Sequence, residues 1–348
     1  MGRWLRLLLI AVPIAVLLRI LGASAPVLFV ASCLGIIPLA QAMGEATEEL
    51  AKHFGERIGG LLNATFGNAT ELIIAFFAVR AGLFGVVIAS ITGSIVGNAL
   101  LVLGLAILVG GWGRVKQTFN VASAHINASL MILAVICVMV PAVFAHAHAG
   151  MDDAAVHSMS MVFSVVMIAA YVLGLVFSLH THRAAFQSPT EHEAPVWSKS
   201  RAAGLLAAAT VCVAALSEFL VSAIEPMTEQ FHLPPLFIGV IIIPIIGNAA
   251  EHAAAVTMAA KDRMDIAMSI AIGSTTQVAL FVAPLLIFMG HVIGQPMGLL
   301  FEPSELVAIG FSVAIVNAIS QDGETNWFEG VLLLAAYTII AVGFYYAR

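Results

Sequence analysis

Long apolar segments separated by short polar ones follow one another along the whole chain. A helix that crosses a bilayer needs about 20 mostly apolar residues, and the chain contains about eleven segments of that kind. They run approximately over residues 4–22, 25–43, 59–80, 83–110, 118–145, 155–180, 201–223, 235–258, 265–290, 304–320 and 326–346. The pattern therefore predicts an all-α polytopic membrane protein with about eleven transmembrane helices.

Composition supports this class and excludes others. Of the 348 residues, 61% are hydrophobic and only 10% are charged, and the mean hydropathy is +1.04. A soluble domain of this length could not cover so much apolar surface with polar atoms. The 14 Lys and Arg against 20 Asp and Glu also argue against a nucleic-acid partner. The lipid bilayer is the expected environment.

Positive charges fall mostly on one side of the predicted spans. With eleven spans, the other side receives only Arg19, Arg80 and Arg348. Cytoplasmic loops carry the excess of Lys and Arg, so we expect a multi-pass protein of the cell inner membrane with a cytoplasmic N-terminus. Residues 1–24 would form an extra N-terminal helix. Their basic start and the small residues that follow also resemble a cleaved signal peptide, an alternative that the sequence leaves open.

The two halves of the chain repeat. Shifting the chain by 180 residues places 45–110 on 225–290, and 17 of these 66 positions are identical, where a composition this biased gives ~6 by chance. The identical positions are mainly polar residues and glycines. We therefore expect a first five-helix repeat at 25–180, a cytoplasmic linker at 181–200 and a second five-helix repeat at 201–348.

An odd number of helices in each repeat has a topological consequence. The second copy must enter the membrane from the opposite side, so the two repeats are inverted relative to each other. Inverted repeats with a central binding site are the architecture of secondary transporters. The repeat therefore favours a transporter that works by alternating access.

Two glutamates occupy equivalent positions near the middle of predicted spans. Glu71 lies in 59–80 and Glu251 lies in 235–258. An ionisable residue at the middle of a bilayer is costly and is a functional-site hypothesis by default. Across the axis that relates inverted repeats, the two carboxylates would face each other.

The residues around these glutamates are typical of a cation site. Glycine weakens the helix before each carboxylate, so that backbone carbonyls can become ligands, while amide and hydroxyl side chains add neutral oxygens. The candidate ion-binding residues are Glu71, Glu251, Asn68, Asn248, Gly67, Gly247, Ser94, Ser274, Asn98 and Gln277. The serines and Asn98 have an alternative use, as hydrogen-bonding groups between packed helices.

The chemistry of this set indicates the cargo. Carboxylates, amides, hydroxyls and carbonyls without a thiolate suit a hard divalent cation, and Ca²⁺ better than Mg²⁺. Two carboxylates in a low dielectric cannot both stay ionised without a counter-ion. Two protons or one Ca²⁺ neutralise the pair, so exchange of Ca²⁺ for H⁺ is expected, with both as transported ions and no cofactor.

The motifs resemble a known family. Gly67-Asn68-Ala69-Thr70-Glu71 with Gly93-Ser94, and Gly247-Asn248-Ala249-Ala250-Glu251-His252 with Gly273-Ser274, are similar to the paired repeat motifs of the Ca²⁺/H⁺ exchanger family within the Ca²⁺/cation antiporter superfamily. The resemblance covers about residues 25–348. It implies ten core helices in two inverted repeats, an extra N-terminal helix, and Glu71 and Glu251 as shared Ca²⁺ and H⁺ ligands. The linker 181–200 departs from many relatives in being much less acidic.

Further polar residues lie near the ends of predicted spans. Glu45 and Glu225 occupy equivalent positions and, with their neighbours, could form ion-access funnels or proton relays; solvated charges at helix ends are the alternative. His252 could relay protons beside Glu251 or serve helix packing. The candidates for proton relay or ion access are His252, Glu45, Glu225, Glu48 and Glu218, together with Glu49 and Glu229. A histidine-rich loop (His146, His148, Asp152, Asp153, His157) is more simply an ordinary solvated loop than a metal site.

Other functions stay open. Exchange of K⁺ or Na⁺ for H⁺ would need only one charge per cycle, so two central carboxylates are more than it requires. An intramembrane metalloenzyme would need a pattern such as HExxH on a helix, which is absent from the sequence. A channel would not need a pair of protonatable groups. A homo-oligomer is neither indicated nor excluded.

Overall fold

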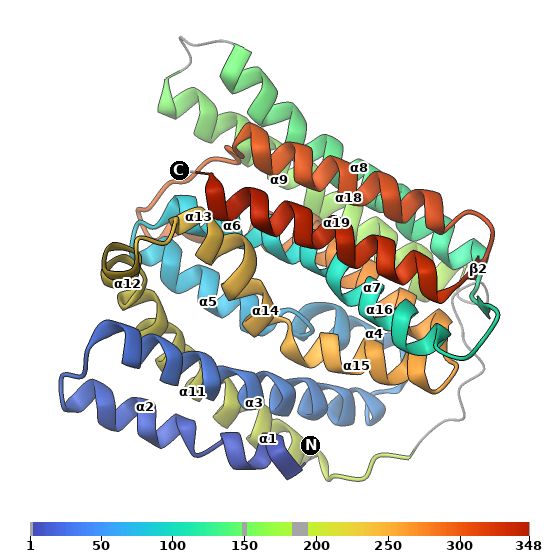
Figure 1. Cartoon of the computed structure of the whole chain (residues 1–348), viewed down its shortest axis with the longest axis horizontal. Coiled ribbons are helices and arrows are strands. Elements are labelled where there is room, and N and C mark those ends of the chain that lie inside the picture. The colour runs from blue at the N-terminus through green and yellow to red at the C-terminus, as the bar shows by residue number, and fades with distance from the viewer. Residues whose placement is uncertain (1–2, 148–151, 183–193, 348) are drawn as a thin grey trace.

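The computed structural model describes residues 3–147, 152–182 and 194–347. Within these ranges the chain is almost entirely helical (Figure 1). The two strands found there are β1 (Gln117–Thr118) and β2 (Glu324–Thr325), which pair antiparallel with Gln117 opposite Thr325. The predicted all-α class is confirmed.

The first half of the chain forms helices that lengthen or break at particular residues. The helices, with π-helical turns labelled η, are α1 (Arg3–Leu8), α2 (Ala11–Ile20), α3 (Ala25–Lys52), α4 (Gly55–Phe66), α5 (Ala69–Arg80), α6 (Phe84–Val96), η1 (Gly97–Val102), α7 (Leu103–Gly111), α8 (Val121–Ala147), α9 (Asp153–Val176) and η2 (Phe177–Thr181).

The second half continues in the same manner. It contains α11 (Lys199–Ser222), α12 (Ile224–Phe231), α13 (Pro235–Phe237), η3 (Ile238–Ile242), α14 (Ile243–Gly247), α15 (Ala249–Ala260), α16 (Met264–Gln277), η4 (Val278–Val282), α17 (Ala283–Val292), α18 (Pro303–Ile319) and α19 (Trp327–Tyr346).

The sequence repeat is visible in these bounds. Helix α5 at Ala69–Arg80 recurs as α15 at Ala249–Ala260, 180 residues later. Each is followed by a long helix with a π-helical turn at its middle, η1 in one half and η4 in the other. The π-helical turn begins three residues after Ser94 in the first half and four residues after Ser274 in the second. Such turns are frequent at functional sites.

Among the described residues, seven helices are long and apolar enough to span a membrane, or nine segments if each of two bent helix pairs counts as one span. The two further spans that the sequence predicts are present as shorter helices. Helix α18 has 17 residues. The N-terminal segment breaks between α1 and α2 because Pro13 has no N–H to bond the carbonyl of Leu9. Each of the eleven predicted spans is therefore found as a helical segment.

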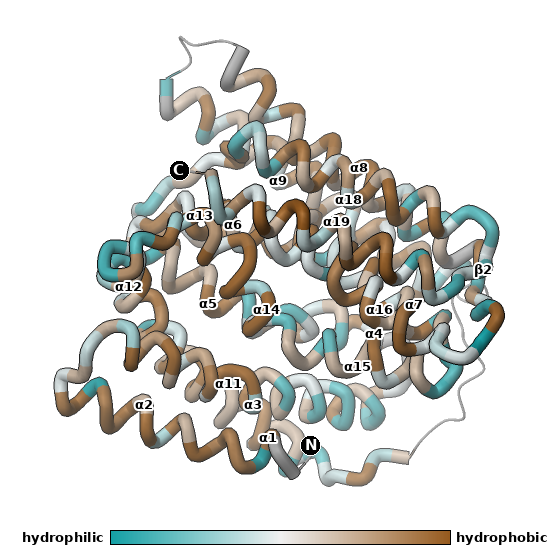
Figure 2. The backbone as a smooth tube through the Cα atoms, in the orientation of Figure 1, coloured by the Kyte–Doolittle hydropathy of each residue, from teal (hydrophilic) through white to brown (hydrophobic). Residues whose placement is uncertain are grey.

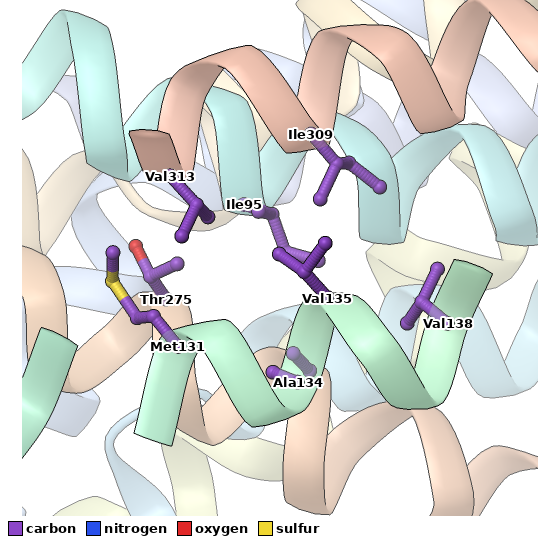
Figure 3. Close-up of a pocket in the computed structure, with 9 residues that line it drawn as sticks. Ile95, Met131, Ala134, Val135, Val138, Thr275, Ile309 and Val313 are labelled. Atoms are coloured by element: carbon purple, nitrogen blue, oxygen red, sulfur yellow. The ribbon is translucent and has the colours of Figure 1, made fainter. Parts of the chain in front are cut away.

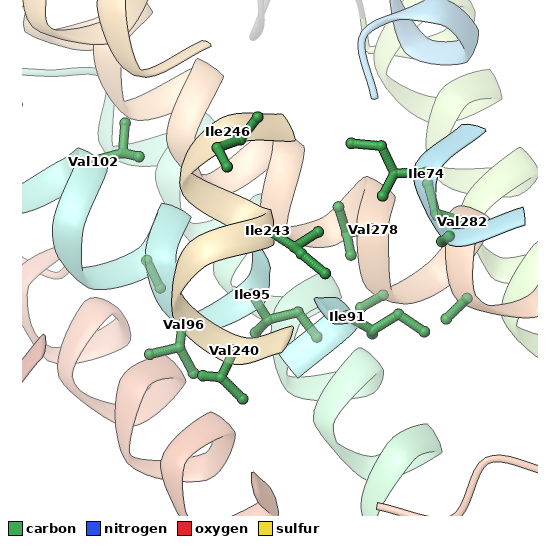
Figure 4. Packing of buried hydrophobic residues seen from close by; sticks show 14 of the residues in the cluster. Ile74, Ile91, Ile95, Val96, Val102, Val240, Ile243, Ile246, Val278 and Val282 are labelled. Carbon is green, nitrogen blue, oxygen red and sulfur yellow. The ribbon is translucent and has the colours of Figure 1, made fainter. Parts of the chain in front are cut away.

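The helices enclose one contiguous apolar core. Helices α3 and α11 pack side by side along their length, with α2 beside them at the edge of the molecule (Figure 1). The long helices are largely hydrophobic, while hydrophilic segments gather at places such as α12 and the region of β2 (Figure 2). Ile74, Val240 and Ile243 bring α5, η3 and α14 together in the buried cluster of Figure 4. This core holds the helix breaks in place.

Candidate functional site

Two spans are broken at equivalent points inside the molecule. Residues Ile58–Phe66 and Ala69–Arg80 meet at 40°, and Pro235–Gly247 and Ala249–Ala260 meet at 61°. The breaks fall at Asn68 and Asn248, whose φ/ψ of −97°/26° and −93°/10° leave the helical region. Gly67 and Gly247, just before them, weaken the helix as the sequence predicts. Each break creates a helix N-terminus in the interior.

The two glutamates occupy the third position of the helices that start at these breaks. Glu71 lies in the first turn of α5 and Glu251 in the first turn of α15. Glu71 is buried and Glu251 is half-buried. The N-terminus of a helix carries a partial positive charge that favours an anion there. Each half-helix therefore stabilises the carboxylate that it carries.

The asparagines at the breaks bond across to the other repeat. Asn68 and Asn248 stand at the N-cap positions, yet neither side chain caps its own helix. Asn68 Oδ1 instead accepts from Ser274 Oγ at 2.9 Å. Asn248 Nδ2 donates to Ser94 Oγ at 3.2 Å and to the carbonyl of Pro244 at 3.0 Å. The equivalent asparagine–serine pairs thus cross between the repeats in both directions.

Ser274 joins one of these pairs to a glutamate. Its hydroxyl accepts from Asn98 Nδ2 at 2.8 Å and lies 2.9 Å from Glu251 Oε2, the same distance as from Asn68 Oδ1. Asn98 Nδ2 also donates to Asn248 Oδ1 at 3.3 Å. One network therefore includes residues of α6, α16 and both breaks.

Glu71 completes the arrangement from the opposite side. Its polar neighbours are the side chains of Asn248 and Ser94, and its carboxylate interacts with the charge of Glu251. Gly247 lies so close that a Cβ there would be 2.8 Å from Glu71 Cγ. Correspondingly, a Cβ at Gly67 would be 3.8 Å from Glu251 Oε1. Gly247 therefore makes room for Glu71, whereas a side chain at Gly67 would be closest to the carbonyl oxygen of Asn63, at 2.8 Å.

Three buried polar atoms of this cluster lack a hydrogen-bond partner among the described residues. They are Glu71 Oε1, Asn68 Nδ2 and Asn98 Oδ1. Buried polar atoms are nearly always paired with protein or with bound groups. Two oxygens without a partner, one of them on a carboxylate, indicate a place where a cation or a proton would be held.

The carbonyl of Ala64, which the break at Asn68 frees, is already engaged. It accepts from Gln277 Nε2 at 2.6 Å and from the Tyr171 hydroxyl at 2.9 Å. In the other repeat the carbonyl of Pro244 keeps its helical bond from the backbone N–H of Asn248 and also accepts from the Asn248 side chain. Gln277, which the sequence places among the ion ligands, therefore also braces the end of α4. Tyr171 had no sequence signal beyond a phenol inside an apolar segment.

The candidates for proton relay and ion access lie outside this network. His252 follows Glu251 on α15 and is half-buried. Glu45 on α3 accepts from Gln41 at 3.1 Å, and Glu48 forms an ion pair of 3.6 Å with Lys52. Glu218 and Glu225 are exposed. Glu45 belongs to the second half of α3, whereas Glu225 belongs to the first turn of α12.

Glu49 anchors the end of the linker instead of facing the site. Its Oε2 accepts from the backbone N–H of Val196 at 2.7 Å and of Trp197 at 2.9 Å. Its Oε1 accepts from Lys52 Nζ at 3.0 Å. The carboxylate therefore fastens the segment before α11 to the end of α3.

A further buried carboxyl was not singled out from the sequence. Glu305, in the first turn of α18, is 1% exposed. Its Oε1 accepts from Thr92 Oγ1 at 3.2 Å and its Oε2 from the backbone N–H of Glu302 at 2.8 Å. It caps α18 and ties it to α6. An acidic residue at the start of a predicted span gave too weak a signal to separate it from an ordinary helix end.

Other metal arrangements were also considered. Among the described residues, no group of three or more His, Cys, Asp or Glu side chains is placed to hold a metal ion. Of the predicted loop cluster, His148 lies outside the described residues, and Asp152 accepts from the backbone of Ala155 as the N-cap of α9. The glutamate site is accordingly a two-carboxylate site supplemented by neutral groups.

An apolar pocket is lined by residues of α6, α8, α16, η4 and α18. Ile95, Met131 and Ile309 face one another across it, and Thr275 is its one polar lining residue (Figure 3). The Thr275 hydroxyl donates to the carbonyl of Ala271 in its own helix. Without a free polar group, this pocket cannot hold an ion.

Comparisons with known proteins show the family to which the chain belongs. The family model of the sodium/calcium exchanger protein matches residues 24–180 and 201–346. The chain is 49% identical over 340 residues to the Ca²⁺/H⁺ antiporter ChaA of Bacillus subtilis, covering 96% of each chain. It is 45% identical over 362 residues to a Ca²⁺/H⁺ antiporter of Synechocystis, covering 97% of this chain and 96% of the relative.

A solved structure shows the same similarity in three dimensions. The structure of native YfkE superposes with a TM-score of 0.87 at 45% identity, covering 98% of this chain and 99% of the other. The similarity therefore extends over both halves, both breaks and the helices between them. The chain is a multi-pass membrane transporter that belongs to the sodium/calcium exchanger protein family, among its Ca²⁺/H⁺ exchangers.

Proposed function

We propose that this protein is a secondary active antiporter that exports cytoplasmic Ca²⁺ in exchange for H⁺. Relatives that match over nearly their whole length carry the name Ca²⁺/H⁺ antiporter. The observation that carries the proposal is that asparagine–serine hydrogen bonds join each helix break to the other repeat. Beside these bonds, Glu71 keeps a buried oxygen without a hydrogen-bond partner among the described residues. Glu71 and Glu251 would be the groups for which Ca²⁺ and protons compete.

A count of hydrogens around Ser274 supports proton binding at Glu251. The hydroxyl has one hydrogen to donate and two acceptors at 2.9 Å, Asn68 Oδ1 and Glu251 Oε2. With Glu251 ionised, the two acceptors compete for that hydrogen. With Glu251 protonated, its O–H can donate to Ser274, which then donates to Asn68, so every contact has its own hydrogen. The network therefore accommodates the protonated state.

The same cluster suits Ca²⁺ as cargo. Both carboxylates and the amide oxygens of Asn68, Asn98 and Asn248 are hard oxygen donors, which Ca²⁺ prefers. Binding of the ion would supply a partner for Glu71 Oε1 and Asn98 Oδ1, the two unpartnered oxygens. Since one Ca²⁺ or two protons neutralise the pair, either load removes the cost of a doubly charged site, while the empty site keeps it.

Helix α3 is placed to open and close this site. Thr70 Oγ1, next to Glu71, donates to Met43 Sδ at 3.8 Å. A Cβ at Gly44 would be 3.9 Å from Ala250 Cβ, next to Glu251. Helix α3 thus passes over the first turn of both half-helices. Sliding of α3 together with α11 over the remaining helices would change which side of the membrane reaches the glutamates.

The direction of transport follows from the charge distribution. The predicted loops on one side contain most of the Lys and Arg residues, which places that side and the N-terminus in the cytoplasm. Because relatives of bacterial origin match over the whole chain, we place the protein in the inner membrane. Ca²⁺ would leave the cytoplasm as protons enter.

The test is Ca²⁺ uptake into proteoliposomes with an acidic interior. Protein-dependent uptake that a protonophore abolishes is expected, and Glu71→Gln or Glu251→Gln should reduce it to background although the variants insert normally. Each amide keeps the size of the side chain but removes its charge. Glu324→Gln, an exposed acid of β2, is the matched control and should transport as the unaltered protein does.

Two results would contradict this proposal. Transport retained in both glutamine variants would disprove the assignment of the site. No Ca²⁺ uptake, with the pH gradient collapsing on addition of K⁺ or Na⁺, would favour monovalent cation exchange instead.

A further inference from the structure

Two histidines from different halves of the chain meet at one end of the molecule. His157 lies near the start of α9 and His291 near the end of α17. His157 Nε2 is 3.0 Å from His291 Nδ1. The rings lie nearly parallel, with an interplanar angle of 18° and centroids 5.2 Å apart. The sequence links His157 only to its own loop and gives no indication of the partner 134 residues away.

The second nitrogen of His157 is held by the backbone. His157 Nδ1 lies 3.1 Å from the carbonyl oxygen of Met297, and a carbonyl can only accept. Nδ1 therefore carries the hydrogen in the neutral ring, which leaves a lone pair on Nε2 directed at His291. Histidines that ligate metals typically donate their other N–H to a carbonyl or carboxylate in this way.

The two nitrogens face each other head on, since they lie 3.0 Å apart while the ring centroids lie 5.2 Å apart, which is the geometry of an N–H···N hydrogen bond. Two imidazole ligands at about 2.0–2.1 Å from a tetrahedral Zn²⁺ stand about 3.3 Å apart with their lone pairs converging on the ion. Binding of an ion by the His157 lone pair therefore requires His291 Nδ1 to swing sideways by about 2 Å. His291 is exposed and belongs to the last turn of its helix, so its ring can make that shift.

The surroundings hold His157 and leave the pair accessible. Ser160 Oγ accepts from the backbone N–H of Leu299 at 2.9 Å, so the segment that contains Met297 is bonded to α9 at a second point. His157 is half-buried beside the exposed His291. One fixed and one adjustable ligand would thus receive the ion from water, with water completing its coordination.

We propose that His157 Nε2 and His291 Nδ1 form a binding site for a Zn²⁺-class transition-metal ion, separate from the glutamate site. Imidazole nitrogen suits Zn²⁺, Cu²⁺ and Ni²⁺, whereas Ca²⁺ prefers oxygen. The bound ion would join α9 of the first half to α17 of the second.

Titration of the full-length protein with Zn²⁺, by calorimetry and without a polyhistidine tag, tests this site. The protein should carry Glu71→Gln and Glu251→Gln, so that Zn²⁺ cannot bind at the carboxylates. One Zn²⁺ per chain is expected to bind, and His157→Ala or His291→Ala should each weaken binding by about tenfold or more. His232→Ala, an exposed histidine at the end of α12, should leave binding unchanged.

Cu²⁺ in place of Zn²⁺ gives a second readout that does not depend on affinity. Its electron paramagnetic resonance spectrum should show coupling to two imidazole nitrogens, and to one in either alanine variant. Binding that both alanine variants retain unchanged, or no binding at millimolar Zn²⁺, would overturn the proposal. Because His291 is exposed, the His291→Ala variant is expected to fold as the parent protein does. An unchanged melting temperature of this variant is the control.

Discussion

Gly247 lies directly against Glu71, although the two residues belong to opposite halves of the chain. A Cβ at Gly247 would be 2.8 Å from Glu71 Cγ and 3.6 Å from its Cδ. Real side chains do not approach so closely, so an alanine there would displace the glutamate. The conformation of one repeat's carboxylate therefore depends on the absence of a side chain in the other repeat.

Gly247→Ala is expected to impair Ca²⁺ transport. Overpacking of this kind costs about 1–3 kcal/mol. A cost within that range that raises the free energy of the Ca²⁺-bound state would lower Ca²⁺ affinity by about tenfold. Uptake measured against Ca²⁺ concentration checks this. Gly273→Ala is the matched control, since a Cβ there meets nothing within 4 Å. Equal uptake by the two variants would contradict the role given to the contact.

Ser274→Ala is expected to lower the apparent Ca²⁺ affinity and to disturb proton binding. The change removes the group that contacts Asn98, Asn68 and Glu251. Loss of a hydrogen bond to a charged group costs about 1.5–3 kcal/mol. Thr276→Val is the control, because the Thr276 hydroxyl bonds only the carbonyl of Ile272 in its own helix among the described residues. Affinity from uptake assays at two pH values distinguishes the variants.

Glu49→Ala is expected to destabilise the protein without changing its affinity for Ca²⁺. The backbone N–H groups of Val196 and Trp197 would lose their acceptor, at a cost of about 1–3 kcal/mol for each group that stays buried. The melting temperature should fall, and limited proteolysis between the halves should become faster. Glu48→Ala, which loses an ion pair of an exposed carboxylate, should melt almost as the parent does. A changed Ca²⁺ affinity in Glu49→Ala would contradict this structural role and would indicate that Glu49 belongs to the ion pathway.

Acidification on the Ca²⁺-binding side is expected to weaken apparent Ca²⁺ affinity. Protons and Ca²⁺ would occupy the same two carboxylates, so binding of one requires release of the other. If both carboxylates are protonated before Ca²⁺ binds, each bound Ca²⁺ displaces two protons. The apparent dissociation constant for Ca²⁺ then rises by about a hundredfold when the pH is lowered by one unit. An apparent dissociation constant for Ca²⁺ that does not change with pH across the titration range would exclude shared ligands for Ca²⁺ and protons.

The sequence predicted much of the central cluster because its signal is carried by polar residues. Asn68, Asn248, Ser94 and Ser274 recur at a shift of 180 residues, and equivalent residues of inverted repeats come together where they lie near the axis that relates them. Their bonding pattern could not be predicted in the same way. An N-cap asparagine ordinarily caps its own helix, and only the packing of α6 and α16 against the breaks redirects it.

Other features depend on contacts that no periodicity reveals. Glu49 resembles the neighbouring Glu48 in sequence, yet it bonds to backbone at the end of the linker, 147 residues away. Gln277 donates to a carbonyl that becomes free only because the helix breaks at Asn68. Helix α3 extends to Lys52, past the apolar stretch 25–43, because polar residues continue the helical hydrogen bonding past the expected membrane edge.

The central claim, that Glu71 and Glu251 hold either Ca²⁺ or protons, is tested most directly by counting protons released on Ca²⁺ binding. The purified protein is titrated with Ca²⁺ in weakly buffered detergent solution while pH is recorded, starting at a pH where the carboxylates are protonated. We expect up to two protons per bound Ca²⁺, and neither binding nor release when both residues are glutamine. Ca²⁺ binding without proton release, or release that persists in the doubly substituted protein, would contradict the claim.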